Sequence, residues 1–370
     1  MNPLPFQPDA GARRSRRSCG SLLLAAHLVL PALRAGSAGV PLGPVGEPLR
    51  APARVAVDAA GRLWVADVAA GEVLAIDLSQ RTATRHGGLA RPLGLAVDSA
   101  GRVYVGEAAT GRVRVFGPDW SELAPLGAGA GEFQLPGHLA VEETDGRVTV
   151  HVSDGAAHVV KSYVDGALVR TLGGPGAGAA DGQFNFPAGL WVSPAHELFV
   201  VDQNNHRVQV FGPDGAWRRS FPISDGGLGD RAQGLAGDGQ GRLFVADTFQ
   251  GFVRVFTESG QETGTAGDYG DRMGALRSPA GVAWLGGERL AVASLNTGRV
   301  ELFSLGGGPR IWIQSAAGGH LVLHWDGALY ELRWAPSLAG PWEPVAAEGI
   351  HTVTPDPARR AAFYRLERRP

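Results

Sequence analysis

Amide, histidine and aromatic side chains gather in three short stretches of the sequence, DQNNHR (202–207), DTFQGF (247–252) and SLNTGR (294–299). Each stretch follows an apolar, β-branched run, so we expect each to be a turn that exposes these side chains. Amides donate and accept hydrogen bonds, and aromatic rings pack on apolar groups or sugars. The stretches therefore predict a surface that binds a peptide or a glycan, with ordinary solvated turns as the alternative. The candidate side chains are Gln203, Asn204, Asn205, His206, Phe249, Gln250 and Asn296.

Histidines and acids that could bind a metal are present but scattered. A Zn site needs several converging ligands, and His138 is one candidate without partners at a recurring spacing. Glu142, Asp154 and Asn205 could be combined into a divalent-cation site, although no spacing demands it. The sequence shows no convincing Ser-His-Asp arrangement, and its Gly-rich runs are not followed by helices, as phosphate loops are. We therefore expect no catalytic residue, no metal and no cofactor. Three further histidines occupy strand or turn positions: His151, His158 and His206.

The elements that must position these residues come from a repeat. GRVYVGEAATGRVRVF (101–116) and GRLFVADTFQGFVRVF (241–256) are nearly the same sequence. Copies begin 40 to 51 residues apart, a period typical of arrays and propellers, whose repeats bury their apolar faces only against neighbours. The repeat predicts one large domain over residues 39–306. Its six copies begin at Pro52, Pro92, Pro136, Pro187, Ala232 and Pro279.

Each copy has the pattern of a small antiparallel sheet. Runs such as LFVAD (243–247) and VRVF (253–256) are short, β-branched and bounded by turn residues. Between the first two strands, DAAGR (58–62) and its counterparts supply an Asp that accepts local hydrogen bonds and a Gly that tolerates a positive φ. The residue that ends the second strand is expected to cap the next turn, with a catalytic role as the alternative. These residues are Asp67, Glu107, Asp154, Asp202, Asp247 and Ser294. A large apolar residue ends the third strand and should fill the space between sheets.

The stretch HRVQVFGPDG (206–215), after FPAGLWVSPAHELFVVD (186–202), resembles the NHL repeat family of β-propellers. The resemblance covers residues 40–305, and the third and sixth copies depart from the pattern. It implies an all-β fold, a six-bladed β-propeller, with ligands bound by loops on one propeller face. The second residue after each repeat's first residue should then face the central channel. These residues are Arg54, Gly94, His138, Gly189, Gly234 and Gly281, and they add Arg54 and His138 to the ligand-binding candidates.

The two ends of the repeat region complement each other. The sixth copy passes from Phe303 into GGGP (306–309) and has no run for a fourth strand. VPLGPVG (40–46), ahead of the first copy, resembles LAPLGAGAG (123–131). We therefore expect Val40–Gly46 to be the outer strand of the sixth blade, paired with Val300–Phe303, which would hide a sheet edge.

The chain ends do not follow the repeat. Residues 1–38 have the basic stretch, short apolar run and small-residue end (AGSA, 35–38) of a signal peptide, which predicts a secreted, periplasmic or cell-surface protein. Residues 307–370 predict a small C-terminal β-sandwich-like domain, similar to modules that end many secreted bacterial proteins. Its tryptophans are interpreted as core, with a carbohydrate-binding strip as the alternative: Trp312, Trp325, Trp334 and Trp342.

Charge and composition exclude some partners. The formal net charge is -2, and beyond the basic stretch of the predicted signal peptide the arginines are scattered, so we expect no nucleic-acid partner. No segment after residue 38 is apolar enough for a membrane helix, and we expect a monomer. The function predicted from the sequence is noncatalytic binding or scaffolding of a protein, peptide or glycan. Propellers related to NHL proteins include metal-dependent lyases and lactonases, so such an enzyme is the alternative.

Overall fold

The computed structural model describes residues 40–41, 49–80, 82–223, 231–271, 275–305, 312–315, 321–324, 330–335, 341–345, 350–353 and 363–368. The chain divides into two units, Met1–Leu33 and Arg34–Pro370, and all described residues belong to the second. Strands account for nearly all of its regular structure, with two short 3₁₀ turns. The predicted signal peptide, residues 1–38, lies outside the described residues. Among the described residues, no helix has the length and apolar character needed to cross a membrane.

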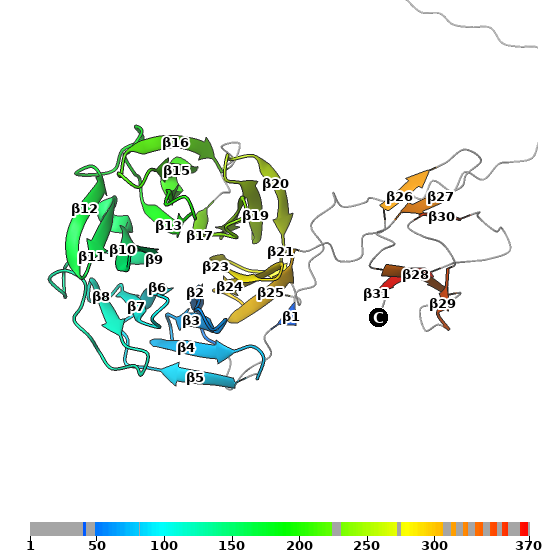
Figure 1. Cartoon of the computed structure of the whole chain (residues 1–370), viewed down its shortest axis with the longest axis horizontal. Coiled ribbons are helices and arrows are strands. Elements are labelled where there is room, and N and C mark those ends of the chain that lie inside the picture. Colours follow the sequence, from blue (N-terminus) through cyan, green and yellow to red (C-terminus); the bar gives the residue numbers. More distant parts are fainter. Residues whose placement is uncertain are drawn as a thin grey trace, which may run out of the picture. The chain divides into compact units, whose positions relative to one another are not determined.

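Six antiparallel sheets follow one another around a ring and form the blades of a β-propeller (Figure 1). This arrangement confirms the six-bladed fold expected from the repeat. The strands of blades 1 to 3 are β2 (Pro52–Val57), β3 (Leu63–Asp67), β4 (Glu72–Asp77) and β5 (Thr82–His86); β6 (Pro92–Val97), β7 (Val103–Glu107) and β8 (Arg112–Phe116); β9 (Pro136–Thr144), β10 (Arg147–Asp154), β11 (Val159–Val164) and β12 (Ala167–Gly173).

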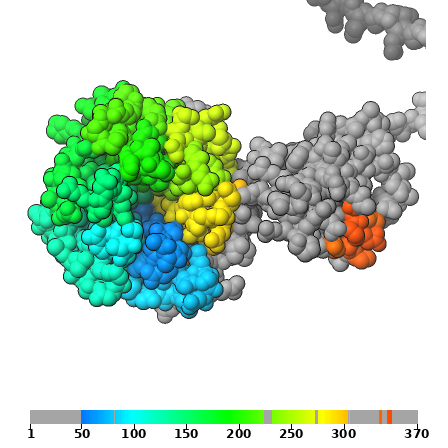
Figure 2. All heavy atoms as spheres, in the orientation of Figure 1, coloured from blue at the N-terminus to red at the C-terminus, as the bar shows by residue number. Residues whose placement is uncertain are grey.

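Blades 4 to 6 complete the ring in chain order, as the colours of Figure 2 also show. A short parallel pair, β21 (Asp268–Tyr269) and β22 (Ala275–Leu276), lies between blades 5 and 6 in the sequence. The strands of these blades are β13 (Pro187–Val192), β14 (Leu198–Asp202), β15 (Arg207–Phe211) and β16 (Trp217–Pro222); β17 (Ala232–Gly237), β18 (Arg242–Asp247), β19 (Phe252–Thr257) and β20 (Glu262–Ala266); β23 (Pro279–Gly286), β24 (Arg289–Ser294), β25 (Arg299–Ser304) and β1 (Val40–Pro41).

The ring is closed by the N-terminal strand. β1 pairs antiparallel with β25, and Val40 lies opposite Leu302 while Pro41 lies opposite Glu301. This pairing confirms that a segment ahead of the first copy supplies the outer strand of blade 6. The rest of the expected strand, residues 42–46, lies outside the described residues. Blade 2 differs from the others because its sheet has three strands, and a single bridge between Phe116 and Glu122 continues its outer edge.

The turns between first and second strands follow the chemistry expected from the sequence. In blade 1, a carboxylate oxygen of Asp58 accepts hydrogen bonds from the N–H groups of Ala60 and Arg62, at 3.0 and 2.9 Å. Gly61 adopts a φ of +77°, a left-handed conformation that favours glycine. The other Asp58 oxygen accepts the indole N–H of Trp64 at 2.9 Å, so the turn is tied to the blade beneath it.

The residue that ends each second strand holds the loop that enters its own blade. Asp202, for example, is fully buried and accepts the N–H of Asn185, two residues before β13. Blade 6 uses Ser294 instead, whose Oγ accepts the N–H of Arg277 at 2.8 Å. These contacts agree with the structural role that the sequence analysis preferred. The corresponding donors in the other blades are Arg50, Ala90, Gln134 and Arg231.

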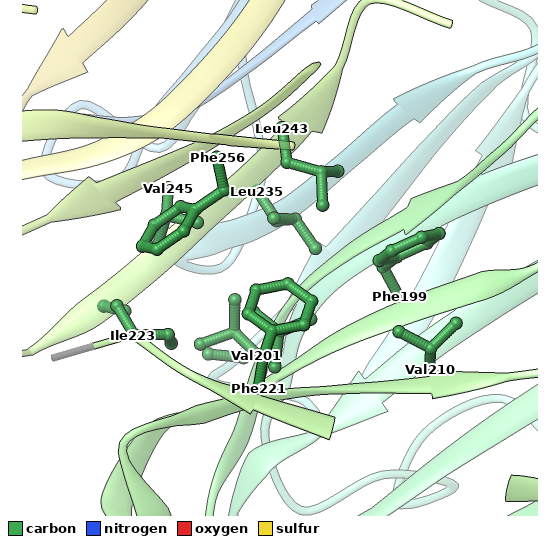
Figure 3. Close-up of a cluster of buried hydrophobic side chains, with 12 residues drawn as sticks. Phe199, Val201, Val210, Phe221, Ile223, Leu235, Leu243, Val245 and Phe256 are labelled. Atoms are coloured by element: carbon green, nitrogen blue, oxygen red, sulfur yellow. The ribbon is translucent and has the colours of Figure 1, made fainter. Parts of the chain in front are cut away.

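The core lies between neighbouring blades. Between blades 4 and 5, the rings of Phe221 and Phe256 face one another with centroids 5.8 Å apart (Figure 3). Phe256 is the large apolar residue at or next to the end of the third strand, and its counterparts are buried in the same way. The blades therefore bury their faces only against each other, as the repeat length implied. The counterparts are Ile76, Phe116, Tyr163, Phe211 and Phe303.

The C-terminal strands form two three-stranded sheets. The order is β26–β27–β30 in one and β29–β28–β31 in the other, and every pair is antiparallel. The described residues beyond the propeller are therefore mostly β strands, whereas the proposed boundary at residue 307 and the roles of the tryptophans stay predictions. The strands are β26 (Trp312–Ser315), β27 (Leu321–His324), β28 (Tyr330–Ala335), β29 (Glu343–Pro344), β30 (Ile350–Val353) and β31 (Phe363–Arg368).

Candidate binding site

The first strands of all six blades line one hollow of about 300 Å³, which we call the central hollow. Its lining comes from three or four consecutive residues of each first strand. Most of the side chains that line it are aliphatic and include Val57, Val97, Val141, Leu235 and Ala283, whereas polar atoms contribute at least half of its accessible surface. A concave site of this volume is at the small end of typical ligand pockets.

Two tryptophans of the central hollow lie near the ends of their strands. Trp191 and Trp284 are both half-buried, so each ring is partly available to a ligand. Trp284 stacks on Phe244 with ring centroids 5.5 Å apart, and the guanidinium of Arg242 lies 5.2 Å from the Trp284 ring centroid. Trp191 packs against Phe199 with centroids 5.3 Å apart. Packing on the blades fixes both rings, which suits them to hold an apolar group.

Arg54 lies across the ring axis on the innermost strand of blade 1. Its side chain donates hydrogen bonds from Nε to the carbonyl of Gly137 at 3.0 Å, and from Nη1 to the carbonyls of Ala53 and Ala280 at 2.8 and 3.1 Å. These carbonyls belong to blades 3, 1 and 6. Burial lowers the pKa of Arg54 to about 10, which still leaves the group charged at neutral pH. The expectation that Arg54 faces the axis is therefore confirmed.

His138 stands at the equivalent position of blade 3 and lines the central hollow. Its Nδ1 accepts a hydrogen bond from the N–H of Leu190 at 3.2 Å, so the proton of the neutral ring belongs to Nε2. Burial, with a further contribution from the charge of Arg54, holds the pKa of His138 well below its ordinary value. The adjacent Leu139 backbone acts in the opposite direction and does not offset these two effects. His138 is therefore a neutral donor at physiological pH.

A second hollow of about 350 Å³, the side hollow, shares Val141 and Trp191 with the central hollow. Glu142 lines it and bridges two histidines, at 3.2 Å to Nε2 of His151 and 2.8 Å to Nδ1 of His196. The hydrogen bond with His151 is the main cause that lowers the pKa of Glu142, against the opposing effect of burial.

The hydrogen bonds of Glu142 continue through His151 to the third strand of blade 3. Nδ1 of His151 lies 2.9 Å from Oγ of Ser162, which gives a Ser–His–Glu chain across three neighbouring strands. His151 and Ser162 are both buried, so the hydroxyl has no access to a substrate. The network therefore joins β9, β10 and β11. Among the described residues, no group of three or more His, Cys, Asp or Glu side chains could hold a metal ion.

The amide candidates from the sequence lie at the other ends of the strands, in the turns between second and third strands. All three amides of the first turn are hydrogen-bonded within the fold. Nε2 of Gln203 donates to the carbonyl of Ala232 at 2.8 Å, and Nδ2 of Asn205 donates to Asp202 and to the carbonyl of Gly178. Asn204 and His206 of the same turn are exposed, and Nδ2 of Asn204 donates to Oδ1 of Asn185 at 3.1 Å. The four residues sit together, but only the buried Gln203 links blade 4 to blade 5, whereas Asn205 is half-buried and its hydrogen bonds stay next to blade 4.

The remaining candidates come from the equivalent turns of blades 5 and 6. Phe249 is 67% exposed and Gln250 is half-buried. Asn296 is exposed and donates to Oγ of Ser278 at 2.8 Å. Ligand binding by these turns stays a prediction, and neither turn lines the central hollow.

Trp191 and Trp284 are the site residues that the sequence analysis missed. Both stand in first-strand runs, PAGLWV (187–192) and PAGVAWL (279–285), where most other copies carry small or aliphatic residues. That departure was a usable signal, because a tryptophan is large for the narrow end of a blade. The repeat pattern concealed it, since both runs still read as ordinary apolar strands.

Comparisons with known proteins agree with this architecture. The NHL repeat family model matches residues 89–116 and 184–211. A 44-residue stretch is 39% identical to the Drosophila melanogaster protein brain tumor, and the match spans 12% of this chain and 4% of that protein.

Solved structures with the same architecture include enzymes and a calcium-binding protein. A gluconolactonase from Xanthomonas campestris has a TM-score of 0.55 and 17% identity, covering 73% of this chain and 91% of its own. A streptogramin B lyase has a TM-score of 0.51 and 12% identity, covering 75% of this chain and 91% of its own. Regucalcin from Agrobacterium tumefaciens has a TM-score of 0.53 and 16% identity, covering 72% and 93%. Identities this low establish the fold alone. The chain is thus a six-bladed β-propeller in which residues 89–116 and 184–211 match the NHL repeat.

Proposed function

We propose that this protein is an exported, noncatalytic binding module whose central hollow holds an apolar group of its ligand. The observation that carries the proposal is the lining of that hollow, to which all six first strands contribute apolar side chains. Burial of apolar surface is the driving force that such a lining offers to a ligand. The partly available rings of Trp191 and Trp284 extend the apolar surface.

The lining also distinguishes between ligand classes. A glycan needs several hydrogen-bonding partners, whereas valine, leucine and alanine dominate the side chains of the central hollow. An apolar group of a protein, a peptide or a small molecule fits this surface better. A glycan-binding role, as the sequence also allowed, would instead use the exposed Asn204, Phe249 and Asn296 at the other ends of the strands.

Binding of the neutral apolar dye N-phenyl-1-naphthylamine tests the proposal. We expect a saturable fluorescence increase with one site per chain. Val97→Trp fills the central hollow and is expected to weaken binding at least about tenfold, a change of roughly 1.4 kcal/mol. Val169→Trp, at a residue 59% exposed on outer strand β12, is the matched control and should bind like the wild type. Unchanged binding by Val97→Trp would show that the central hollow is not the site.

The noncatalytic part of the proposal has its own test. Metal analysis of the dialysed protein is expected to find no stoichiometric Zn or Ca, and a gluconolactone should hydrolyse no faster than in buffer. A full equivalent of Zn that disappears in His138→Ala would support the metal-dependent alternative. So would lactone hydrolysis that EDTA abolishes.

A further inference from the structure

His138 is the one ionisable side chain in the lining of the central hollow. It is 8% exposed, and its Nδ1 is engaged by the N–H of Leu190. The proton on Nε2 makes this ring a hydrogen-bond donor. His138, Trp191 and Trp284 are therefore the three side chains of the lining that can donate to an acceptor, and His138 is the one beside Arg54.

A buried positive charge lies next to that position. Arg54 is 5% exposed, and its Nε donates to the carbonyl of Gly137, the residue immediately before His138. Its three hydrogen bonds go to backbone carbonyls, which are neutral, and no carboxylate of the described residues forms an ion pair with it. Nη2 makes no hydrogen bond within the described part of the chain.

A buried charge without a counter-ion is costly, because the protein interior solvates it less well than water does. Carbonyl dipoles reduce that cost for Arg54 but supply no net negative charge. A ligand that brings an anionic group to His138 would neutralise the guanidinium at short range, where the low dielectric strengthens the attraction. The pair therefore favours a ligand whose buried end is negatively charged.

We propose that the ligand of the central hollow is a small apolar carboxylate. Its carboxylate accepts the Nε2–H of His138 beside the charge of Arg54, and its hydrocarbon part lies along the valine and leucine walls toward Trp191 and Trp284. This inference rests on the proposed function and adds the chemical class of the ligand. A volume of about 300 Å³ suits a molecule of a few to about a dozen carbon atoms.

A homologous series that differs only in its head group tests the inference on the unmodified protein. Octanoate, octanol and octylammonium are titrated against bound N-phenyl-1-naphthylamine. We expect octanoate to displace the dye at a concentration at least about tenfold lower than octanol, because hydrogen bonds to charged groups are the stronger ones. Octylammonium should be the weakest of the three. Equal displacement by octanoate and octanol would overturn the inference and leave the apolar binding function intact, whereas absence of dye binding would remove both.

Substitutions then test which residues cause the preference for octanoate over octanol. Arg54→Gln keeps a polar side chain but removes the charge, and is expected to bring the octanoate-to-octanol ratio close to one. His138→Gln should lower the same ratio while octanol binding changes less. Arg85→Gln, on outer strand β5 of the same blade, removes an equal charge far from the axis and should leave the ratio unchanged. A wild-type ratio in a folded Arg54→Gln variant would exclude the guanidinium as its source.

Two further probes separate possible sources of a carboxylate. The C-terminus of a peptide carries the same chemistry, and N-acetyl-leucine with its amide reports on it. Tighter binding of N-acetyl-leucine than of octanoate, lost in the amide, would make a peptide C-terminus the occupant and overturn the small-molecule proposal. Acetate has no apolar chain and should not displace the dye. Displacement by acetate as strong as by octanoate would show a nonspecific anion site.

Discussion

At the scale of single residues, the acids at the ends of the second strands show how one position is used six times. In blade 4, Gln209 on the third strand donates to Asp202, whereas in blade 2 the equivalent Arg114 pairs with Glu107 at 3.3 Å. Blade 6 reverses the arrangement. Its second strand ends in the neutral Ser294, and the acid moves to the third strand as Glu301, which lies 3.1 Å from Arg299. The residue that ends the second strand thus needs an oxygen atom that accepts the hydrogen bond of the entering loop, and it does not need a charge.

Substitution of Asp67 measures how much the hydrogen bonds to this position contribute to the free energy of unfolding. Asp67 is fully buried and accepts the N–H groups of Arg50, Ala51 and Ala70 at 2.6, 2.9 and 3.1 Å. Asp67→Ala leaves three donors without an acceptor and is expected to lower the free energy of unfolding by about 3 kcal/mol or more. Asp67→Ser should lose less, because Ser294 performs the same task in blade 6. Urea denaturation compares them.

The control for this comparison is Asp77→Ala. Asp77 also accepts turn hydrogen bonds, from Ser79 and Gln80, but it lies in an exposed turn. Its loss should lower the free energy of unfolding clearly less than the loss of Asp67. An equal decrease in the free energy of unfolding for Asp67→Ala and Asp77→Ala would mean that the buried hydrogen bonds of Asp67 contribute no more than those of an ordinary turn.

His138 should make the stability of the protein depend on pH in a defined window. Its pKa in the folded chain is well below the ordinary value of 6.5, because of burial and of the Arg54 charge. Below pH 6.5 the unfolded chain binds a proton that the folded chain does not, so the free energy of unfolding falls as the pH falls. The slope should approach about 1.4 kcal/mol per pH unit between pH 6 and pH 5 and vanish above pH 7.

The measurement is urea denaturation at pH 7, 6 and 5 for the wild type and His138→Gln. The variant should lose most of the slope. His86→Gln is the comparison. Burial also lowers the pKa of His86, whose ring stacks on Trp120 with centroids 3.9 Å apart, but not as far below the ordinary value as that of His138, so this variant should lose less of the slope. A wild-type slope in His138→Gln would mean that other groups cause the pH dependence.

At the scale of elements, the strongest prediction concerns how the ring is closed. β1 pairs with β25 and covers an edge of blade 6 that would otherwise be open. Removal of residues 39–46 leaves those backbone groups unpaired, each net hydrogen bond being worth roughly 0.5–1.5 kcal/mol. We expect this deletion to lower the melting temperature of the propeller clearly.

Removal of the chain from Pro309 onward is the comparison. It leaves every pairing of β1, β23, β24 and β25 in place, so the melting temperature of the propeller should change far less. Thermal melts of the two truncated chains compare the two melting temperatures. The opposite order of stabilities would mean that the C-terminal part, rather than β1, holds the ring closed.

The innermost strands approach each other closely at their glycines. A Cβ at Gly281 would lie 2.8 Å from both the carbonyl oxygen of Ala53 and the Cα of Arg54, which are backbone atoms of the neighbouring blade. Gly281→Ala is therefore expected to lower the free energy of unfolding by about 2 kcal/mol or more through overpacking. Gly264→Ala, on outer strand β20, meets nothing within 4 Å and should be neutral or slightly stabilising. Denaturant melts that rank the two variants equally would contradict this packing.

At the scale of the whole molecule, the proposal of export leads to a simple expectation. The basic and apolar stretches of residues 1–38 and the small residues at 35–38 have the order of a signal peptide. The protein recovered from outside the cytoplasm should therefore begin near Gly39, one residue before β1. N-terminal sequencing of that material tests this, and a chain that retains Met1 would count against export by this signal.

The architecture of the molecule could be derived from its sequence because a repeat multiplies a weak signal. One run such as LFVAD fits many folds, whereas six copies at similar spacing allow few arrangements. The same logic identified the acceptor at Asp202, the core position at Phe256 and the closing segment at Val40. Each depends on local hydrogen bonding or on an apolar position that recurs in every copy.

The candidate binding site, in contrast, could be predicted only in part from the sequence. The sequence indicated that Arg54 and His138 face the axis. It did not indicate that Arg54 donates hydrogen bonds to the carbonyls of Gly137 and Ala280, more than eighty residues away. Nor did it show that Trp191 and Trp284 line one hollow with Val57. Sequence patterns fix which elements form, because strand alternation and turn chemistry act over a few neighbours. Only the closed ring decides which side chains from six blades share one small volume, because that depends on packing between residues distant in the chain.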